Sequence, residues 1–444
     1  MTSVNRHPNR RLIQAREDLE EARASEDQHR ISLATANLGL AYFNAKKFKE
    51  GEKSFREAEK IVEEVDDFSL RVKFLGIKTL AYQFSGQLPV AFQVAQDIQE
   101  LAEDQEVIGL QSDALATQAQ ILIESGDEIG SLDKFNAALK IAEESEDKKR
   151  IMRVKGALGH YSLAIGSGQQ AETYFEEARD LARDLGDRGS EIGYQGNLGT
   201  LFEWKGDYPQ AKEIFEDVLA FMRETGNQQA EIQALHHLIQ ISTKLQNNSQ
   251  SVEYSRRGIE LTKKDDIDTL FFFYENLISA LYRSEKIDQA HTATKEALER
   301  ARSAEDTEKE VSLLLSLGES YMLTDKLELA LETYQLALDG TQRLQRLVDR
   351  AYLLGRTGVV LAELEKTDEA IVYHQQSLEA ARNHELIGLE GEQLTMLAIA
   401  YRDKNEMGKA KDYANQALQV FLNSEKELEA EKVRQLLSEF KAAF

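Results

Sequence analysis

The histidines are the first residues that could carry acid–base chemistry or hold a metal ion. The chain has eight of them, and none belongs to the His-Glu-x-x-His pattern of zinc-dependent hydrolysis. His236 and His237 are adjacent, so on a helix their side chains diverge by about 100° and cannot easily share one metal ion. The absence of cysteine excludes disulfides, thiolate catalysis, thiolate zinc sites and iron–sulfur clusters. We therefore predict no cofactor and no metal.

Two short segments are similar to ligand-binding loops. Gly166-Ser167-Gly168 is similar to a phosphate loop, but no strand pattern precedes it and no Gly-Lys-Ser/Thr follows. Asp265-Asp266-Ile267-Asp268 could suggest calcium, but it lacks the spacing and the glycine of an EF-hand loop. No nucleophile, base and orienting group can be assigned together, so we predict that the chain is not an enzyme.

The charge balance bears on the kind of partner. Among 444 residues, 78 are acidic and 54 are basic, which gives a net charge of −24. This balance argues against general binding to a nucleic-acid backbone. The first residues lack the apolar core of a secretory signal, and no stretch approaches the roughly 18 apolar residues of a membrane span. The sequence predicts a cytoplasmic protein that binds neither nucleic acid nor a membrane.

A small residue recurs every 40 residues along nearly the whole chain, with one interval of 39. These anchors are Gly51, Ala91, Ser131, Ala171, Ala211, Ser251, Ala290, Ala330, Ala370 and Ala410. Four residues after an anchor, five repeats carry an aromatic residue, namely Phe55, Phe135, Phe175, Phe215 and Tyr334. Twelve residues before it, five carry a glycine, usually after a leucine: Gly39, Gly159, Gly199, Gly318 and Gly358. A fixed period of this length is the signature of a solenoid.

Each repeat is expected to form two amphipathic helices, because apolar and small residues recur at steps of three and four. The turn between the two helices is marked by Gly86, Gly126, Gly166 and Gly206. N-caps are expected before the first helix of the next repeat at Asp27, Asp67, Asp147, Asp187, Asn227 and Asp306. A glycine kept at one helical phase, such as Gly199, predicts close contact between two helices.

These residues resemble the tetratricopeptide repeat; in repeat five the signature reads Asn197-Leu198-Gly199, followed by Phe202, Gly206, Tyr208, Ala211 and Phe215. The 40-residue period resembles the subgroup found in kinesin light chains, spindle-orientation scaffolds and the sensor domain of maltose-type activators. The resemblance implies an all-α, right-handed superhelical solenoid of about ten helix-turn-helix units with capping helices at both ends. We expect a disordered tail at 1–8, a capping helix at 9–26, ten repeats over 27–425 and a second capping helix at 426–444.

In this family the first helices line the inner, concave surface, and one face of them holds the candidate binding residues. The positions 18, 14, 11 and 7 residues before each anchor form an i, i+4, i+7, i+11 line on one helix face. We call these sixteen positions in repeats four to seven the central stripe, and they contain no Asp or Glu. The predicted partner-binding residues on it are Arg153, His160, Asn197, Thr200, Trp204, Gln233, His237, Gln240, Lys244, Phe272, Asn276, Ser279 and Arg283.

Several stripe residues could hold a peptide backbone. Asparagine, glutamine and histidine can both donate and accept hydrogen bonds. In related repeats the asparagine before Leu-Gly clamps an extended ligand; Asn197 matches that motif, and Asn276 matches its position. Of the aromatic run Phe271 to Tyr274, only Phe272 lies on the stripe, and the other three are expected in the core.

The favoured interpretation is a non-catalytic scaffold or adaptor. It would bind another protein or peptide, as an extended neutral-to-acidic segment or a helix, in the concave groove. The alternative is a peptide-sensing regulator whose superhelix changes when a ligand binds. A sensor of the bacterial type would carry a further N-terminal effector domain, for which residues 1–26 are too short.

Overall fold

The computed structural model describes residues 8–442, and every regular element within this range is an α-helix. The predicted all-α repeat architecture is therefore confirmed. Most of the predicted tail, residues 1–7, lies outside the described residues, and the first helix begins at Pro8. The chain divides into an N-terminal part that ends at His237 and a C-terminal part that begins at Leu238. We describe each part by itself.

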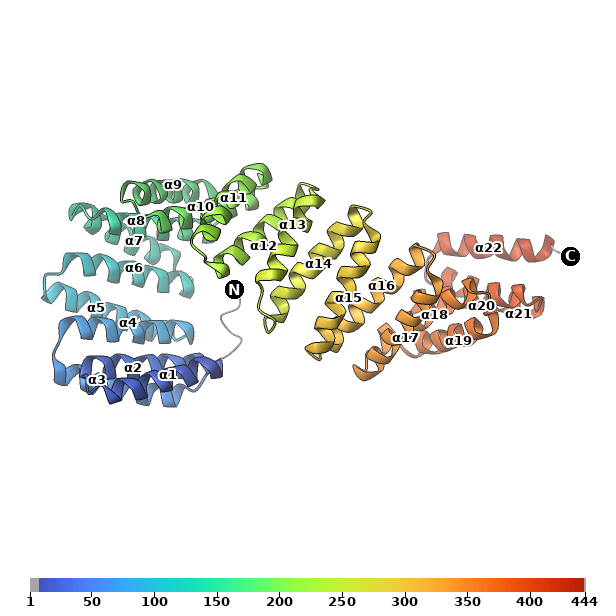
Figure 1. Cartoon of the computed structure of the whole chain (residues 1–444), viewed down its shortest axis with the longest axis horizontal. Coiled ribbons are helices and arrows are strands. Elements are labelled where there is room, and N and C mark those ends of the chain that lie inside the picture. The colour runs from blue at the N-terminus through green and yellow to red at the C-terminus, as the bar shows by residue number, and fades with distance from the viewer. Residues whose placement is uncertain (1–7, 443–444) are drawn as a thin grey trace. The chain divides into compact units, whose positions relative to one another are not determined.

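The N-terminal part is a row of helix pairs in which each helix packs on the next in chain order (Figure 1). Even-numbered helices from α2 onward are the first helices of the repeats, and the odd-numbered helices that follow are the second. The helices of this part are α1 (Pro8–Ala24), α2 (Gln28–Asn44), α3 (Phe48–Val65), α4 (Phe68–Phe84), α5 (Leu88–Asp104), α6 (Ile108–Ser125), α7 (Glu128–Glu144), α8 (Lys148–Ala164), α9 (Gly168–Asp184), α10 (Arg188–Lys205) and α11 (Tyr208–Glu224).

The boundary between the two parts falls inside α12 (Gln228–Lys244). The C-terminal part continues the same pattern of helix pairs (Figure 1). Its further helices are α13 (Asn248–Leu261), α14 (Ile267–Arg283), α15 (Ile287–Ser303), α16 (Thr307–Leu323), α17 (Leu327–Arg343), α18 (Leu347–Glu363), α19 (Thr367–Asn383), α20 (Ile387–Asp403), α21 (Met407–Asn423) and α22 (Glu427–Ala442).

The turns between helices explain the period. Most helices are 17 residues long and are followed by a three-residue turn, so a helix and its turn take 20 residues. The middle turn residue usually adopts positive φ, as Gly166 does at +79°; Gly206, which directly follows the 18-residue helix α10, has φ +81°. The next amide, that of Asp207, then donates to the Phe202 carbonyl at 2.9 Å, which closes the helix end in a Schellman arrangement. Positive φ at all four predicted turn glycines confirms that prediction.

One connection in the C-terminal part departs from this rule. The helix α13 has only 14 residues, and its C-cap Thr262 is extended, with φ −74° and ψ 130°. No residue from Thr262 to Asp266 has positive φ. The Thr262 hydroxyl instead donates to the Gly258 carbonyl at 2.7 Å. This connection lies in the one interval where the period is 39 rather than 40 residues.

The predicted N-caps are also confirmed. Asp187 accepts a hydrogen bond from the amide of Ser190 at 3.1 Å and thereby satisfies one of the unpaired donors in the first turn of α10. The other predicted caps that accept from their own first turn are Asp27, Asp67, Asp147, Asn227 and Asp306. The caps therefore fix where the first helices of the repeats begin.

The core of a repeat is built around a contact between the glycine of its first helix and the aromatic residue of its second helix. A Cβ atom added to Gly199 would lie 2.9 Å from Cε2 of Phe215, so the ring seats directly on the glycine. The same pairing joins Gly39 with Phe55, Gly159 with Phe175 and Gly318 with Tyr334. In repeat nine the ring is His374, which is buried against Gly358. The predicted close contact at Gly199 is thus confirmed.

Helices α1 and α22 cover the ends of the described chain. The apolar face of α1, with Leu12 and Leu19, packs on α2. In α22, Val433 and Phe440 are buried, and Leu436 and Leu437 pack beside them on the last core cluster. The remaining positions of both helices are largely charged.

Candidate functional site

The central stripe lies on α8, α10, α12 and α14, and none of its sixteen positions is buried. Beside it, Leu198 and Gly199 are buried, as are Phe271, Phe273 and Tyr274. The interpretation of the aromatic run as core with only Phe272 on the stripe is therefore confirmed. The stripe is divided between the two parts of the chain. Arg153 to His237 belong to the N-terminal part and Gln240 to Arg283 to the C-terminal part.

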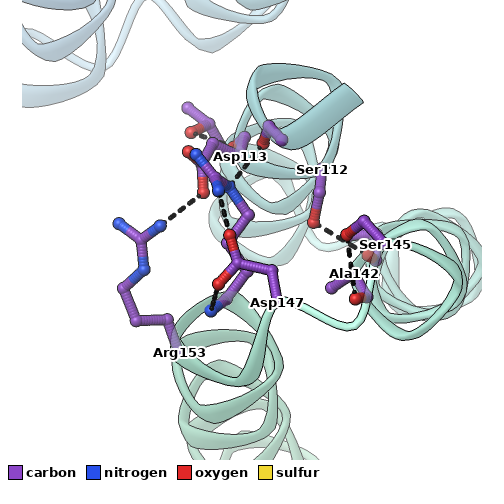
Figure 2. Close-up of polar contacts among 10 residues, drawn as sticks. Ser112, Asp113, Ala142, Ser145, Asp147 and Arg153 are labelled. Atoms are coloured by element: carbon purple, nitrogen blue, oxygen red, sulfur yellow. Dashed lines mark hydrogen bonds and ion pairs between the residues drawn. The ribbon is translucent and has the colours of Figure 1, made fainter. Parts of the chain in front are cut away.

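Arg153 is held by a carboxylate from the preceding repeat. Its guanidinium donates to Oδ1 of Asp113 on α6 at 2.9 Å. The other oxygen of Asp113 lies 3.3 Å from Nε of Arg150, which also pairs with Asp147 (Figure 2). Asp147 is the N-cap of α8, and its carboxylate accepts a hydrogen bond from the backbone amide of Arg150. This hydrogen bond lowers the pKa of the Asp147 carboxyl group. Arg153 is therefore already ion-paired, although the stripe itself contains no carboxylate.

His160 and Asn197 meet on the exposed faces of neighbouring first helices. The Asn197 amide nitrogen lies 3.3 Å from Nε2 of His160. The His160 ring stands edge-on to the Phe175 ring at 5.0 Å, and desolvation lowers the pKa of this histidine. A neutral imidazole can accept from the amide, so the pair is preorganised to present the Asn197 side chain to the solvent side.

His237 is positioned by the repeat before it. Its Nδ1 lies 2.9 Å from a carboxylate oxygen of Glu203, and its ring stacks on Phe215 at 4.4 Å with an angle of 7°. Glu203 stands one position before Trp204, outside the stripe. The carboxylate nevertheless reaches a stripe residue, so the stripe is less free of negative charge than its own sequence indicates.

Trp204 is the most exposed aromatic residue of the central stripe, with 70% of its surface accessible. It borders a pocket of about 280 Å³ that Leu163, Gly168, Thr200 and Leu201 also line. The indole packs on the backbone of the preceding turn, since a Cβ on Gly168 would lie 3.2 Å from its ring. The Thr200 hydroxyl donates back to its own helix at Gly196. The result is an apolar hollow beside a large, exposed ring.

In the C-terminal part the stripe residues lie in different environments. The Asn276 amide nitrogen donates to the Phe272 carbonyl of its own helix at 2.8 Å, which uses one of its two N–H donors. Gln240 and Lys244 are exposed on α12. Ser279 and Arg283 line a pocket of about 750 Å³ between α14 and α16. The predicted pair of clamping asparagines is therefore not equivalent in structure.

The sequence shows carboxylates beside the central stripe, at Asp113 in repeat three and at Glu203 one position off it, but it does not predict their contacts with stripe residues. Asp113 and Glu203 reach it from neighbouring positions. The large pocket also uses a second line one residue before the stripe on α14, with Phe271, Glu275, Ile278 and Tyr282. That line has the same i, i+4, i+7, i+11 spacing, so the signal was present in the sequence.

Within the described part of the chain, neither a metal-binding cluster nor a membrane-spanning helix is present. Across residues 8–442, no group of three or more histidine, aspartate or glutamate side chains is arranged to hold a metal ion. Over the same range, no helix is both long enough and apolar enough to cross a membrane.

The helix pairs described above have the tetratricopeptide-type fold that the sequence resemblance implied. No family model and no curated protein matches the chain. Solved structures similar to it include RapI, at 13% identity over 77% of this chain and 99% of that one, with a TM-score of 0.45. The repeats of a kinesin light chain from Podosopora anserina are 13% identical to this chain. The match covers 44% of this chain and 97% of that one, with a TM-score of 0.38.

A longer stretch of the chain is similar to a signal transduction ATPase with a tetratricopeptide repeat sensor from Pyrococcus horikoshii. The identity is 13%, over 91% of this chain and 69% of that one, with a TM-score of 0.41. At these identities the likeness concerns the fold alone.

Proposed function

We propose that this protein is a non-catalytic scaffold or adaptor that binds an extended segment or a helix of a partner protein along the central stripe. The observation that carries the proposal is the exposure of Trp204 beside its apolar pocket. Tryptophan is the residue most enriched among binding hot spots, because it buries a large area at low cost in side-chain entropy. A partner side chain placed in the pocket would bury the Trp204 ring together with the apolar residues that line the pocket.

The polar residues next to Trp204 suit a peptide backbone. Asn197 and His160 form one preorganised pair, and Gln233 is exposed on the next first helix. We propose that Asn197 rather than Asn276 is the main clamping residue, because Asn197 is oriented by a side chain of the neighbouring first helix, whereas the Asn276 amide turns back to the backbone of its own helix. Thr200 lines the pocket, and His237 is held in place by Glu203.

The charge of the partner segment follows from which cations remain available. Arg153 is paired with Asp113. Lys244 and Arg283 have no ion pair among the described residues. We therefore propose a segment that is neutral at the N-terminal part of the stripe, with acidic residues where it meets Lys244 and Arg283 of the C-terminal part.

The test begins with co-purification of the full chain from native lysate and mass spectrometry of what binds. Affinity for the purified partner is then measured by calorimetry. Trp204→Ala should weaken binding at least about tenfold. The matched control is Phe84→Ala, since Phe84 occupies the same position in repeat two and is 66% exposed; it should change affinity less than about twofold.

The outer surface supplies the second control, Glu176→Ala with Glu177→Ala on α9. If either control abolishes binding while Trp204→Ala does not, the central stripe is not the binding surface. A short peptide that stays bound through purification, in place of a protein, would support the sensing regulator instead.

A further inference from the structure

The pocket between α14 and α16 is distinct from the hollow at Trp204. Its volume is about 750 Å³, within the roughly 300–1,000 Å³ typical of small-molecule sites. Its apolar lining includes the half-buried Tyr282 and the largely buried Ile278 and Leu313, whereas Phe271 is only 1% exposed and has the Lys309 amino group 5.0 Å from its ring centroid. Ser279, Ser312 and Ser316 add hydroxyl groups from the two facing helices. A concave apolar site with a few polar groups is the usual form of a ligand pocket.

One of these lining side chains has an unmet hydrogen bond. The Tyr282 hydroxyl is buried, and it has no partner among the described residues. Buried hydroxyl groups are nearly always hydrogen-bonded, to protein, water or ligand. The Tyr282 side chain lines the pocket, but its hydroxyl oxygen is not accessible from it, so this hydroxyl is not available to a ligand bound there.

The cations at the pocket differ in whether they are already paired. The Lys309 amino group lies 4.0 Å from the Asp268 carboxylate. Arg346 lies 3.0 Å from Asp349 and 3.4 Å from Glu308. Arg283 has no ion pair among the described residues and is exposed. It is therefore the lining cation that can accept an anionic group without breaking an existing pair.

The opposite end of the pocket is negative. Glu275 precedes Arg283 by eight residues on α14, which corresponds to about 12 Å along the helix. Glu275 also has no ion pair in the described part of the chain. A ligand with anionic groups at both ends would be repelled by Glu275, whereas a single anionic group near Arg283 would not.

We propose that this pocket binds a free small molecule in which an aromatic or aliphatic body carries one anionic group, such as an aryl carboxylate. The body would lie on Tyr282 and reach Ile278 and Leu313, and the anion would pair with Arg283. This site needs no partner protein, so it goes beyond the scaffold function and does not depend on it.

Two fluorescent probes with matched aromatic bodies test the proposal on the full chain. 1-Anilinonaphthalene-8-sulfonate carries an anionic group, and N-phenyl-1-naphthylamine lacks it. The anionic probe should saturate one site. Arg283→Gln should weaken its binding about tenfold and change binding of the neutral probe less than about twofold. 3-Phenylpropionate should displace the anionic probe more strongly than 3-phenylpropionamide does.

Two further variants keep the result decisive. Arg300→Gln removes an exposed arginine of α15 outside the pocket and should leave both probes unaffected. Ser279→Trp should fill the pocket and weaken both probes. Equal affinity of the anionic probe for Arg283→Gln and the native chain would overturn the anion site. Unchanged binding of both probes to a folded Ser279→Trp would overturn the pocket. Neither result bears on Trp204, so failure here is distinguishable from failure of the proposed scaffold function.

Discussion

At the scale of single residues, the seat of the Phe215 ring on Gly199 shows why glycine recurs at this phase. A side chain at position 199 would have to displace a buried ring of the second helix, because its Cβ would start 2.9 Å from that ring. Gly193, six residues earlier on α10, is also helical, but an added Cβ there would meet nothing within 4 Å. A substitution at Gly199 therefore tests packing, whereas the same substitution at Gly193 tests helix propensity alone.

Gly199→Leu should destabilise the protein by about 1–3 kcal/mol through overpacking. Gly193→Leu should be neutral or stabilising by up to about 0.7 kcal/mol, because leucine favours a helix over glycine. Urea unfolding followed by circular dichroism measures both. Because a solenoid repeat contacts only its neighbours, hydrogen exchange should rise mainly in repeats four to six of Gly199→Leu. Equal destabilisation by the two variants would contradict the packing explanation.

Single residues also show how far the sequence could predict the site. Caps, turn glycines and the exposed face of each first helix depend on local periodicity, and all of them can be predicted from one chain. The ion pair of Arg153 with Asp113 and that of His237 with Glu203 depend on how neighbouring repeats lie side by side. A residue one position off the predicted face can reach it from the next helix, and periodicity within one helix does not report this.

At the scale of elements, a recurring ion pair joins the end of a second helix to the start of the next first helix at four junctions between repeats. Arg183 bonds to Glu191 at 2.9 Å, across the turn between α9 and α10. The same spacing of eight residues recurs in Arg223 with Glu231, Arg302 with Glu310 and Arg382 with Glu390. Glu191 is only 4% exposed and also accepts from Arg188 at 2.8 Å. These pairs tie successive repeats together at their turns.

The hydrogen bond from Arg188, and then that from Arg183, lowers the pKa of Glu191 below its ordinary value of 4.5. The folded chain thus binds fewer protons here than the unfolded chain, so this contribution to stability is present above pH 4.5 and is lost as the pH falls through the lowered pKa. Glu191→Gln should cost about 1–3 kcal/mol at pH 7, because charged hydrogen bonds are lost.

The difference between native chain and Glu191→Gln should therefore shrink on acidification below pH 4.5. Urea unfolding at several pH values measures it. Glu216→Gln serves as a control, because this glutamate of α11, which pairs with Lys212, is far more exposed than Glu191. A difference that grows on acidification would contradict the role assigned to Glu191.

The connection from α13 to α14 is the element that departs from the pattern. The sequence signals it by the single interval of 39 residues between Ser251 and Ala290. The spacing does not specify that the helix would shorten to Leu261 and end at an extended Thr262. Near this helix end the Phe273 ring packs closely against Gly258, whose added Cβ would lie 2.2 Å from it, and the spacing does not specify this contact either.

At the scale of the whole molecule, the net charge of −24 sets a general repulsion. Raising the salt from about 10 to 150 mM shortens the screening length from about 30 Å to about 8 Å. Exposed ion pairs contribute little each, so the relief of repulsion should outweigh their screening. We expect the Tm at pH 7 to rise by about 2 °C or more.

Differential scanning calorimetry at the two salt concentrations measures this shift. A matched measurement near pH 5 is the control, since the sequence pI is about 4.9 and the net repulsion is then small. The salt effect should largely vanish there. A Tm at pH 7 that falls with salt would mean that the ion pairs between repeats dominate the electrostatics.

The 20-residue step of helix and turn gives the chain a mechanical regularity. When a repeat of 40 residues is pulled open from the two ends, it releases about 140 Å of extended chain. Because successive repeats have nearly the same length, stretching would extend the molecule in a series of nearly equal increments. Under load, the extension of the array would therefore report how many repeats have opened and, by difference, how many remain folded.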